Sequence, residues 1–184
     1  LTTPIGNGFK SINVSIRQQL DLFACVRPIR YFPGTSSPMV ESNLTDMVVF
    51  RENTEDLYTG IEWKPNSDGA KKIIEFIKNE FGESPFRFEQ DCGIGIKPVS
   101  KEGSERLINK AIEFALNEKK DSLTIVHKGN IMKFTEGAFR DWAYDLVKHK
   151  YNGVANEDGT YSIKCPKTDH ILIVKDCIAD NFLQ

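Results

Sequence analysis

The sequence predicts an α/β fold with one inserted segment, and three observations support this prediction. Helical stretches with an apolar stripe alternate with short apolar strands along most of the chain, and only one central stretch departs from the alternation. The chain has 184 residues, of which 40% are hydrophobic and 27% are charged. Such values are typical of a globular protein that can bury a core.

The chain begins with a loop that leads into a short amphipathic helix over residues 11–20. Ile12, Ile16 and Leu20 recur at the i, i+4 and i+8 spacing of one helix face. Apolar runs and a Pro/Gly/Ser-rich loop then predict a pair of strands. These elements are, in order, a strand at 22–27 closed by Pro28, a loop at 33–38 and a second strand at 46–51.

A different pattern occupies the stretch from about residue 57 to residue 100. A strand is predicted at 58–63, and a helix at 69–81 has three isoleucines on its inward face. The chain then returns as extended structure over 86–99. Glycines alternate with isoleucines there, in Cys92–Pro98, which favours strands in close backbone approach, or an arm.

The remaining residues return to regular alternation. The apolar pattern predicts a helix, a strand, a second helix, a hairpin and a final helix. Their bounds are, in order, 101–119, 122–127, 135–150, a hairpin of 161–164 with 170–174, and a helix from Cys177 to Leu183.

Composition excludes several classes of function. A net charge of −2 gives no electrostatic reason to expect nucleic acid or an anionic membrane as a partner. No apolar run approaches the roughly 20 residues that span a bilayer, and no basic-then-apolar leader opens the chain. The four cysteines stand far apart and form no C-x-x-C pair, and the three histidines are equally dispersed. We therefore expect a soluble, cytoplasmic protein with reduced thiols.

Both ends of the chain differ from natural domain ends. The sequence starts at Leu1, without a methionine, in a loop-like stretch, and it stops at Gln184 inside an apparent helix. We expect the chain to be an internal fragment of a longer protein.

Three arginines lie at predicted element ends: Arg17 closes a helix, Arg27 precedes Pro28, and Arg51 follows an apolar strand. An arginine at such a position needs an anionic partner, because an unpaired, desolvated charge costs several kcal/mol. Each could pair with one of the 26 acidic residues. Alternatively, the three could converge on a polycarboxylate, which their planar guanidinium groups can bind in bidentate fashion.

Ser11 and Asn13 precede Arg17 by six and four residues. Both residue types are good helix N-caps, which is the simpler interpretation. The functional alternative is that their side chains and the helix N-terminal amides hold one more carboxylate.

Two further candidates, Tyr58 and Lys128, follow strands, where α/β enzymes place functional side chains. Tyr58 could donate a proton or could be a packing residue. Lys128 lies in a basic loop and could act as a base or remain a solvated lysine. Asp180, on a mostly apolar helix, is either solvent-facing or a ligand for a hard cation.

Taken together, these segments resemble the β-decarboxylating dehydrogenase family, and within it the bacterial NADP-dependent isocitrate dehydrogenases. The matching stretches cover nearly the whole chain in the order of the family. They are Leu1–Pro4, Ser11–Arg17, Asp46–Glu62, Cys92–Pro98, Val126–Trp142 and Ile178–Gln184.

The resemblance implies a role for each matching residue. Ser11 and Asn13 resemble the pair that contacts the γ-carboxylate of isocitrate, and Ser11 also resembles a serine that a regulatory kinase phosphorylates in some members. A phosphate there would repel the incoming tricarboxylate. The other implied roles are an arginine clamp of Arg17, Arg27 and Arg51, an acid–base pair of Tyr58 and Lys128, nicotinamide contacts from Thr3 and Asn130, and an Mg²⁺ or Mn²⁺ ligand in Asp180.

The resemblance also implies a fold and a reaction. The fold would be the small α/β sandwich domain of the isocitrate/isopropylmalate dehydrogenase fold with an inserted clasp arm, lacking most of the large domain. The implied division is 1–22 as the end of the large cofactor-binding domain, 23–55 and 102–184 as the small domain, and 56–101 as the clasp. Isocitrate would be oxidised by NADP and decarboxylated, as in the tricarboxylic acid cycle and at its branch to the glyoxylate bypass. The enzyme would be a homodimer with shared active sites. Lys128 and Asp180 would serve the neighbouring subunit's site. Because most of the large domain would be missing, the fragment itself would be inactive.

Two alternatives remain open. A sister dehydrogenase acting on isopropylmalate, homoisocitrate or tartrate would keep the arginine clamp, although an isopropyl group offers no charge for Ser11 and Asn13 to receive. A non-catalytic paralogue that binds a tricarboxylate would not require Tyr58, Lys128 and Asp180. A pure dimerisation module is the simplest interpretation of the fragment alone, and it is distinguished by whether the longer protein supplies the remaining metal-binding aspartates. The residues that would discriminate NADP from NAD are absent from this chain.

Overall fold

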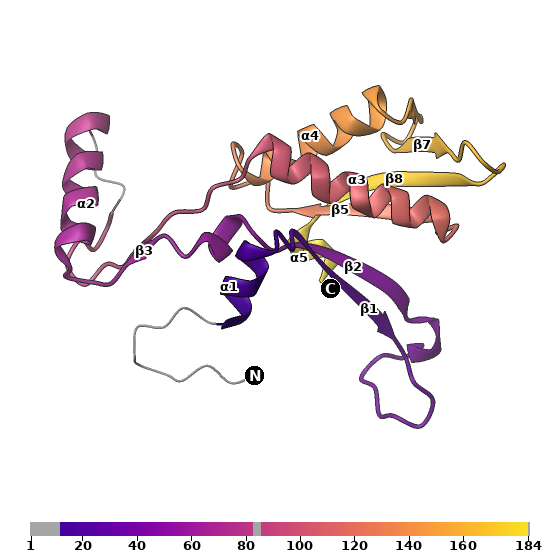
Figure 1. Ribbon diagram of the computed structural model, residues 1–184, viewed down its shortest axis with the longest axis horizontal. Helices are drawn as coiled ribbons and strands as arrows, with labels where there is room; N and C mark the ends of the chain where they lie inside the picture. Colours follow the sequence, from indigo (N-terminus) through magenta and orange to yellow (C-terminus); the bar gives the residue numbers. More distant parts are fainter. Residues whose placement is uncertain (1–11, 83–85, 184) are drawn as a thin grey trace. The chain divides into compact units, whose positions relative to one another are not determined.

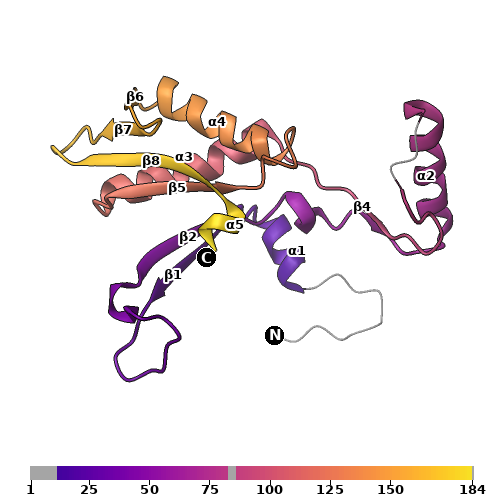
Figure 2. The same cartoon turned by 180° about the vertical axis from the view of Figure 1, so that it is seen from behind.

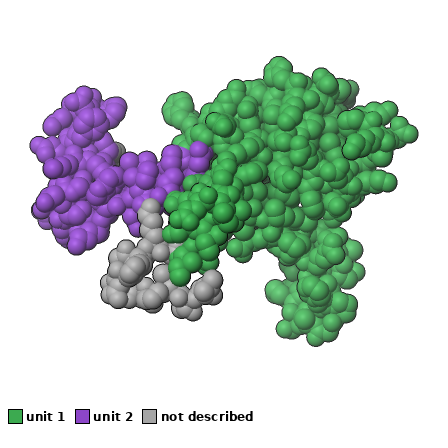
Figure 3. Space-filling view, in the orientation of Figure 1, with its two compact units in different colours: residues 1–54, 99–184 green, residues 55–98 purple. Residues whose placement is uncertain are grey.

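The chain forms two compact units, which are coloured separately in Figure 3. The computed structural model describes residues 12–82 and 86–183. Unit 1 comprises residues 1–54 and 99–184, and unit 2 comprises residues 55–98. The predicted clasp segment, 56–101, overlaps unit 2, and its role in dimerisation stays a prediction.

Unit 1 contains a four-stranded sheet and two long helices, which both ribbon views show side by side (Figures 1 and 2). The strands are ordered β5-β8-β7-β6, with β5 and β8 parallel and the other pairs antiparallel. The bounds are α3 Lys101–Asn117, β5 Ser122–His127, α4 Glu136–His149, β6 Val154–Ala155, β7 Tyr161–Lys164 and β8 Ile171–Ile178. The predicted alternation of helices and strands is therefore confirmed in this unit.

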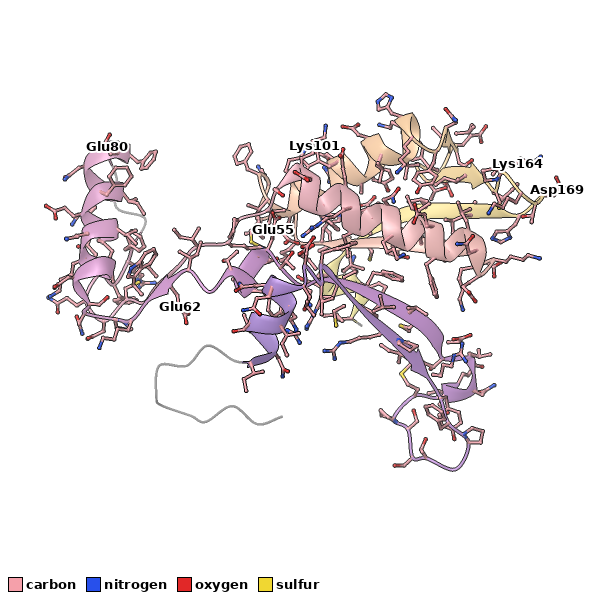
Figure 4. The ribbon with its side chains drawn as sticks, in the orientation of Figure 1. Glu55, Glu62, Glu80, Lys101, Lys164 and Asp169 are labelled. Carbon is pink, nitrogen blue, oxygen red and sulfur yellow. The ribbon has the colours of Figure 1, made fainter. Side chains whose placement is uncertain are left out.

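The core of unit 1 lies between one face of this sheet and the two helices. Alternate residues of β8, Leu172 and Val174, are fully buried, as the period of two in a strand requires. They pack with Ile125 of β5 and with the inward stripes of α3 and α4, represented by Ile112 and Val147. This burial is the main stabilising term of the unit. At the turn that connects β7 to β8, Figure 4 labels Lys164 and Asp169, which form a surface ion pair.

The prediction that Pro28 closes the first strand is wrong. Strand β1, Ala24–Arg30, continues through Pro28 and pairs along its whole length with β2, Asp46–Glu52. Proline has no backbone N–H to donate in the ladder. An edge strand tolerates it where the missing N–H would face away from the partner strand. Arg27 consequently lies in the middle of β1 and not at its end, and the short 3₁₀ helix η1, Ser42–Leu44, precedes β2.

Unit 2 contains less strand than the sequence predicts. Its elements are the 3₁₀ helix η2 Asp56–Thr59, β3 Glu62–Trp63, α2 Asp68–Phe81 and β4 Ile94–Gly95. The predicted strand at 58–63 is wrong in its first half. Asp56 has a φ of 60° and its Oδ1 accepts the N–H of Leu57 at 2.6 Å, while Gly60 ends the turn in the left-handed region. Local turn chemistry therefore replaces extended structure at Tyr58.

The last element also differs from the prediction. The helix expected from Cys177 to Leu183 is reduced to α5, Ala179–Phe182, because β8 extends to Ile178 in parallel register with His127 of β5. Asp180 therefore lies in the first turn that follows a strand, and not within a longer helix. Within residues 12–82 and 86–183, no helix is long and apolar enough to cross a membrane.

Candidate functional site

The carboxyl ends of the parallel strands β5 and β8 bring two predicted site residues together. Lys128 directly follows β5, and Asp180 lies in α5 directly after β8. The Nζ of Lys128 donates to Oδ2 of Asp180 at 2.5 Å. The lysine side chain is 30% exposed and the carboxylate 60%, so the pair lies at the surface of unit 1, accessible to a ligand. Such strand ends are the usual location of functional groups in α/β proteins.

The turn that carries Lys128 is held at both of its peptide groups. The backbone N–H of Lys128 donates to Oε2 of Glu136 in the first turn of α4 at 3.0 Å. The carbonyl of Lys128 accepts the N–H groups of Ile131 and Met132. Gly129 leaves no room for a side chain, because a Cβ there would lie 2.8 Å from Cα of Gly137. The turn is thus packed directly on the start of α4.

His127, the last residue of β5, is buried beside this turn and is only 3% exposed. Its Nε2 lies 2.9 Å from Oδ2 of Asp176, and its Nδ1 lies 2.9 Å from the backbone nitrogen of Gly129. Tyr144 of α4 donates to Oδ1 of Asp176 at 2.6 Å. Burial raises the pKa of the Asp176 carboxyl, but the hydrogen bonds from Tyr144 and His127 outweigh it and leave that pKa below its ordinary value. Burial and the same hydrogen bond raise the pKa of Tyr144.

The predicted arginine clamp is assembled around a thiol. Cys25 and Arg27 share one face of β1, and Arg51 stands opposite Cys25 in the β1–β2 register. Nε of Arg27 donates to Sγ of Cys25 at 3.3 Å. This hydrogen bond, together with the charges of Arg27, Arg51 and Arg17, lowers the pKa of Cys25 against the opposing effect of burial. The structure therefore brings the three arginines into one positively charged region, which we call the arginine face.

A fourth arginine fixes the segment between α1, Ile12–Gln19, and β1. Arg106 of α3 donates to both carboxylate oxygens of Asp21, at 3.0 and 2.9 Å, and to the hydroxyl of Thr54 at 2.8 Å. Its guanidinium group lies 4.7 Å from the centroid of the Phe23 ring. Because α1 has no buried residue of its own, these contacts hold the segment that connects Arg17 to the sheet.

The other predicted site residues are distributed as follows. Thr3 and Ser11 lie outside the described residues. Asn13 is the second residue of α1, so it is not the cap, and its side chain is exposed. Asn130 is exposed in the turn after Lys128, whereas Tyr58 is half-buried in η2 of unit 2.

The described residues fit part of a divalent-cation site. The carboxylate of Asp180 is the hard oxygen donor that Mg²⁺ or Mn²⁺ prefers. Within the described ranges, no group of three or more potential ligands occurs. A cation at Asp180 would consequently need further ligands beyond this carboxylate.

Sequence reasoning misses His127, Asp176 and Cys25 as parts of these sites. His127 is one of three dispersed histidines, although its position at the end of an apolar strand, before Lys128 and Gly129, is an available signal. Asp176 gives no signal, because its contact with Tyr144 joins residues 32 positions apart. The spacing of Cys25 indicates only a reduced thiol.

Unit 1 is an α/β unit with polar groups at the ends of parallel strands and with the arginine face, and comparison with known proteins identifies the family. The sequence profile described as isocitrate/isopropylmalate dehydrogenase matches residues 1–162. The chain belongs to the isocitrate/isopropylmalate dehydrogenase family.

Curated relatives are similar over the whole chain. The NADP isocitrate dehydrogenase 1 of Psychrobacter sp. (strain 13A) is 56% identical, and this chain covers 44% of its length. The corresponding protein of Colwellia maris is 55% identical with 45% of its length covered, and that of Helicobacter pylori (strain J99) is 54% identical with 43% covered. The chain thus spans about half the length of the curated relatives it matches.

Solved structures agree with this assignment. The isocitrate dehydrogenase of Methylococcus capsulatus matches 99% of this chain with a TM-score of 0.69 and 32% identity, and 42% of that chain is covered. A protein of Thermus thermophilus matches 99% of this chain with a TM-score of 0.66 and 30% identity, with 28% of that chain covered. These comparisons confirm the predicted fold class.

Proposed function

We propose that the protein containing this chain oxidises the C2 hydroxyl of isocitrate with NADP and decarboxylates the product to 2-oxoglutarate and CO₂. The observation that carries the proposal is the pairing of Lys128 with Asp180 at the ends of neighbouring parallel strands. The names of the relatives, which are NADP isocitrate dehydrogenases, support the choice of substrate and cofactor.

In this proposal the arginine face supplies binding and orientation. Arg17, Arg27 and Arg51 carry three positive charges for the carboxylates of isocitrate, and Ser11 and Asn13 would contact its γ-carboxylate. Guanidinium groups bind carboxylates through two parallel hydrogen bonds, so they fix direction as well as charge. Orienting the substrate in this way lowers the barrier because less freedom is lost in the transition state.

Proton transfer is assigned to Lys128 and Tyr58. Lys128 assists loss of the C2 hydroxyl proton, and Tyr58 helps to protonate the carbon left after CO₂ departs. Thr3 and Asn130 would contact the nicotinamide of NADP, which would supply hydride acceptance when bound. An Mg²⁺ or Mn²⁺ ion held by Asp180 would supply Lewis-acid stabilisation of developing negative charge.

The proposed assembly is a homodimer with shared active sites, in which unit 2 serves as the interlocking arm. The arm has little core of its own. Only Ala70 and Ile74 are buried among its described hydrophobic residues, whereas Phe81 and Phe88 are more than two-thirds exposed, at 72% and 73%. A partner subunit that covers such rings would stabilise the arm.

Regulation by a kinase at Ser11 and a cytoplasmic location complete the proposal. The location is supported by four cysteines that are all free.

The proposal is tested by cofactor reduction in the full-length protein that contains this chain. Isocitrate and isopropylmalate would each be offered with NADP or NAD in the presence of Mg²⁺. We expect rapid turnover only with isocitrate and NADP. Turnover of isopropylmalate instead would identify a sister dehydrogenase, and no turnover of any substrate would indicate a non-catalytic paralogue. Either result would refute the proposal.

A further inference from the structure

The hydrogen bonds of His127 define its tautomer. A backbone N–H can only donate, so the Nδ1 that lies 2.9 Å from the nitrogen of Gly129 must be the acceptor. The ring proton therefore resides on Nε2, which donates to Oδ2 of Asp176 at 2.9 Å. Both ring nitrogens of a side chain that is 3% exposed are thus satisfied.

Asp176 is itself fixed in place, so the ring has a rigid support. Its second oxygen, Oδ1, accepts the hydroxyl of Tyr144 from α4 at 2.6 Å. Asp176 belongs to β8, the strand whose end also carries Asp180. His127 consequently connects the turn bearing Lys128 to the strand that leads to the ion-pair partner of Lys128.

We infer that His127 is a positioning residue, which holds the Gly129 peptide through Nδ1 and thereby directs Lys128 toward its site of action. This inference rests on the role proposed for Lys128. The N–H of Lys128 is fixed by Glu136 and its carbonyl by Ile131 and Met132, so the Gly129 N–H is a third point that sets the direction of the turn. An apolar residue at position 127 would fill the core equally well but would leave this partly buried donor without its acceptor, which is a costly arrangement.

Two substitutions separate the two hydrogen bonds of the ring. The side-chain oxygen of asparagine occupies the position of Nδ1, so His127→Asn can still accept from Gly129 but cannot reach Asp176. The amide nitrogen of glutamine occupies the position of Nε2, so His127→Gln can still donate to Asp176 but cannot accept from Gly129. If His127 acts as a positioning residue, the two isosteric variants should differ.

The experiment measures kcat and KM for isocitrate in the full-length protein, with thermal unfolding as the control for folding. We expect His127→Gln to lose about 10- to 100-fold in kcat, which is the usual effect of misplacing a reacting group by an ångström, with KM unchanged. The asparagine variant should retain kcat near that of the unchanged protein. Equal losses in both variants, losses in neither, or a larger loss in the asparagine variant would overturn the inference.

A second measurement does not depend on activity. In the unchanged protein labelled with ¹⁵N, a hydrogen bond between the Gly129 amide and Nδ1 of His127 should give a scalar coupling between the two nitrogens, and the Gly129 amide should exchange slowly with solvent. Absence of the coupling together with fast exchange would refute the inference even if no variant folds. If the protein turns over no isocitrate, the proposed function fails, while this measurement still decides whether His127 holds the Gly129 peptide.

Discussion

The two regions that carry the proposed site are built differently. At the ends of β5 and β8, Lys128 is held by backbone hydrogen bonds and adjoins His127, which is almost fully buried. The arginine face lies on a two-stranded ladder, where Arg27 is exposed, and on α1, which has no buried residue. Proton transfer depends on fixed geometry, whereas recognition of a charged substrate acts over longer distances. We therefore expect the first region to determine rate and the second to determine affinity.

The largest expected effect is that of replacing Lys128. In the full-length protein, Lys128→Met should lower kcat for isocitrate by about 10²- to 10⁴-fold, the usual contribution of a positioned acid–base group. Steady-state assays of NADP reduction would measure it. Lys164→Met is the matched control, because it removes a lysine from an exposed ion pair at 3.3 Å in the same unit. A similar loss in the control would contradict the assignment.

A smaller effect is expected on the arginine face. Arg27→Gln removes one of three charges and should weaken isocitrate binding by about 10- to 100-fold, since a charge-assisted hydrogen bond contributes about 1.5–3 kcal/mol. Calorimetric titration would measure the Kd. The same variant should raise the pKa of Cys25, whose thiol accepts from Arg27, and so slow its alkylation at neutral pH. Unchanged alkylation would show that the thiol and the arginine are not in contact.

Overpacking the turn after β5 tests how rigid the first region is. Gly129→Ala would bring a methyl group to 2.8 Å from Cα of Gly137, which is backbone that cannot easily move. We expect a loss of about 1–3 kcal/mol in the free energy of unfolding, measured by denaturant titration. Gly95→Ala, where a Cβ meets nothing within 4 Å, serves as the control. Equal stability of the two variants would indicate a loose turn.

The smallest effect is expected at the support of His127. Tyr144→Phe removes a hydrogen bond to Asp176 and should lower the free energy of unfolding by about 1 kcal/mol at neutral pH. The folded-state pKa of Asp176 is depressed, so its contribution is present above the ordinary value of 3.8 and is lost as the pH falls through the folded-state pKa. The difference between variant and unchanged protein should therefore shrink in acid. A difference that is independent of pH would contradict the contact with Asp176.

Much of unit 1 was predictable from the sequence because its signals are local. The stripe of α3 and the apolar run of β5 reproduce the periods of 3.6 and 2 that helices and strands impose, and their predicted bounds agree closely with the structure. The errors arose where non-local strand pairing or local turn chemistry determines the secondary structure. Parallel pairing with β5 extends β8 to Ile178, and the positive φ of Asp56 replaces a strand with a turn.

The candidate site was predictable only in part for the same reason. Lys128 and Asp180 are 52 residues apart, and only the parallel register of β5 and β8 brings them together. The sequence indicated Arg17, Arg27 and Arg51 as candidates by their residue type and by their predicted positions at element ends. The presence of the Cys25 thiol among them could not be inferred from spacing. The partners of His127 depend on the packing of α4 against the sheet.

The most direct test of the division between rate and affinity is the Kd of isocitrate for the Lys128→Met variant of the full-length protein, measured by calorimetry beside Arg27→Gln. Because Lys128 is assigned to proton transfer and not to clamping the carboxylates, its loss should leave the Kd within about threefold of the unchanged protein. A loss of affinity as large as that of Arg27→Gln would contradict the account, since Lys128 would then belong to the binding surface.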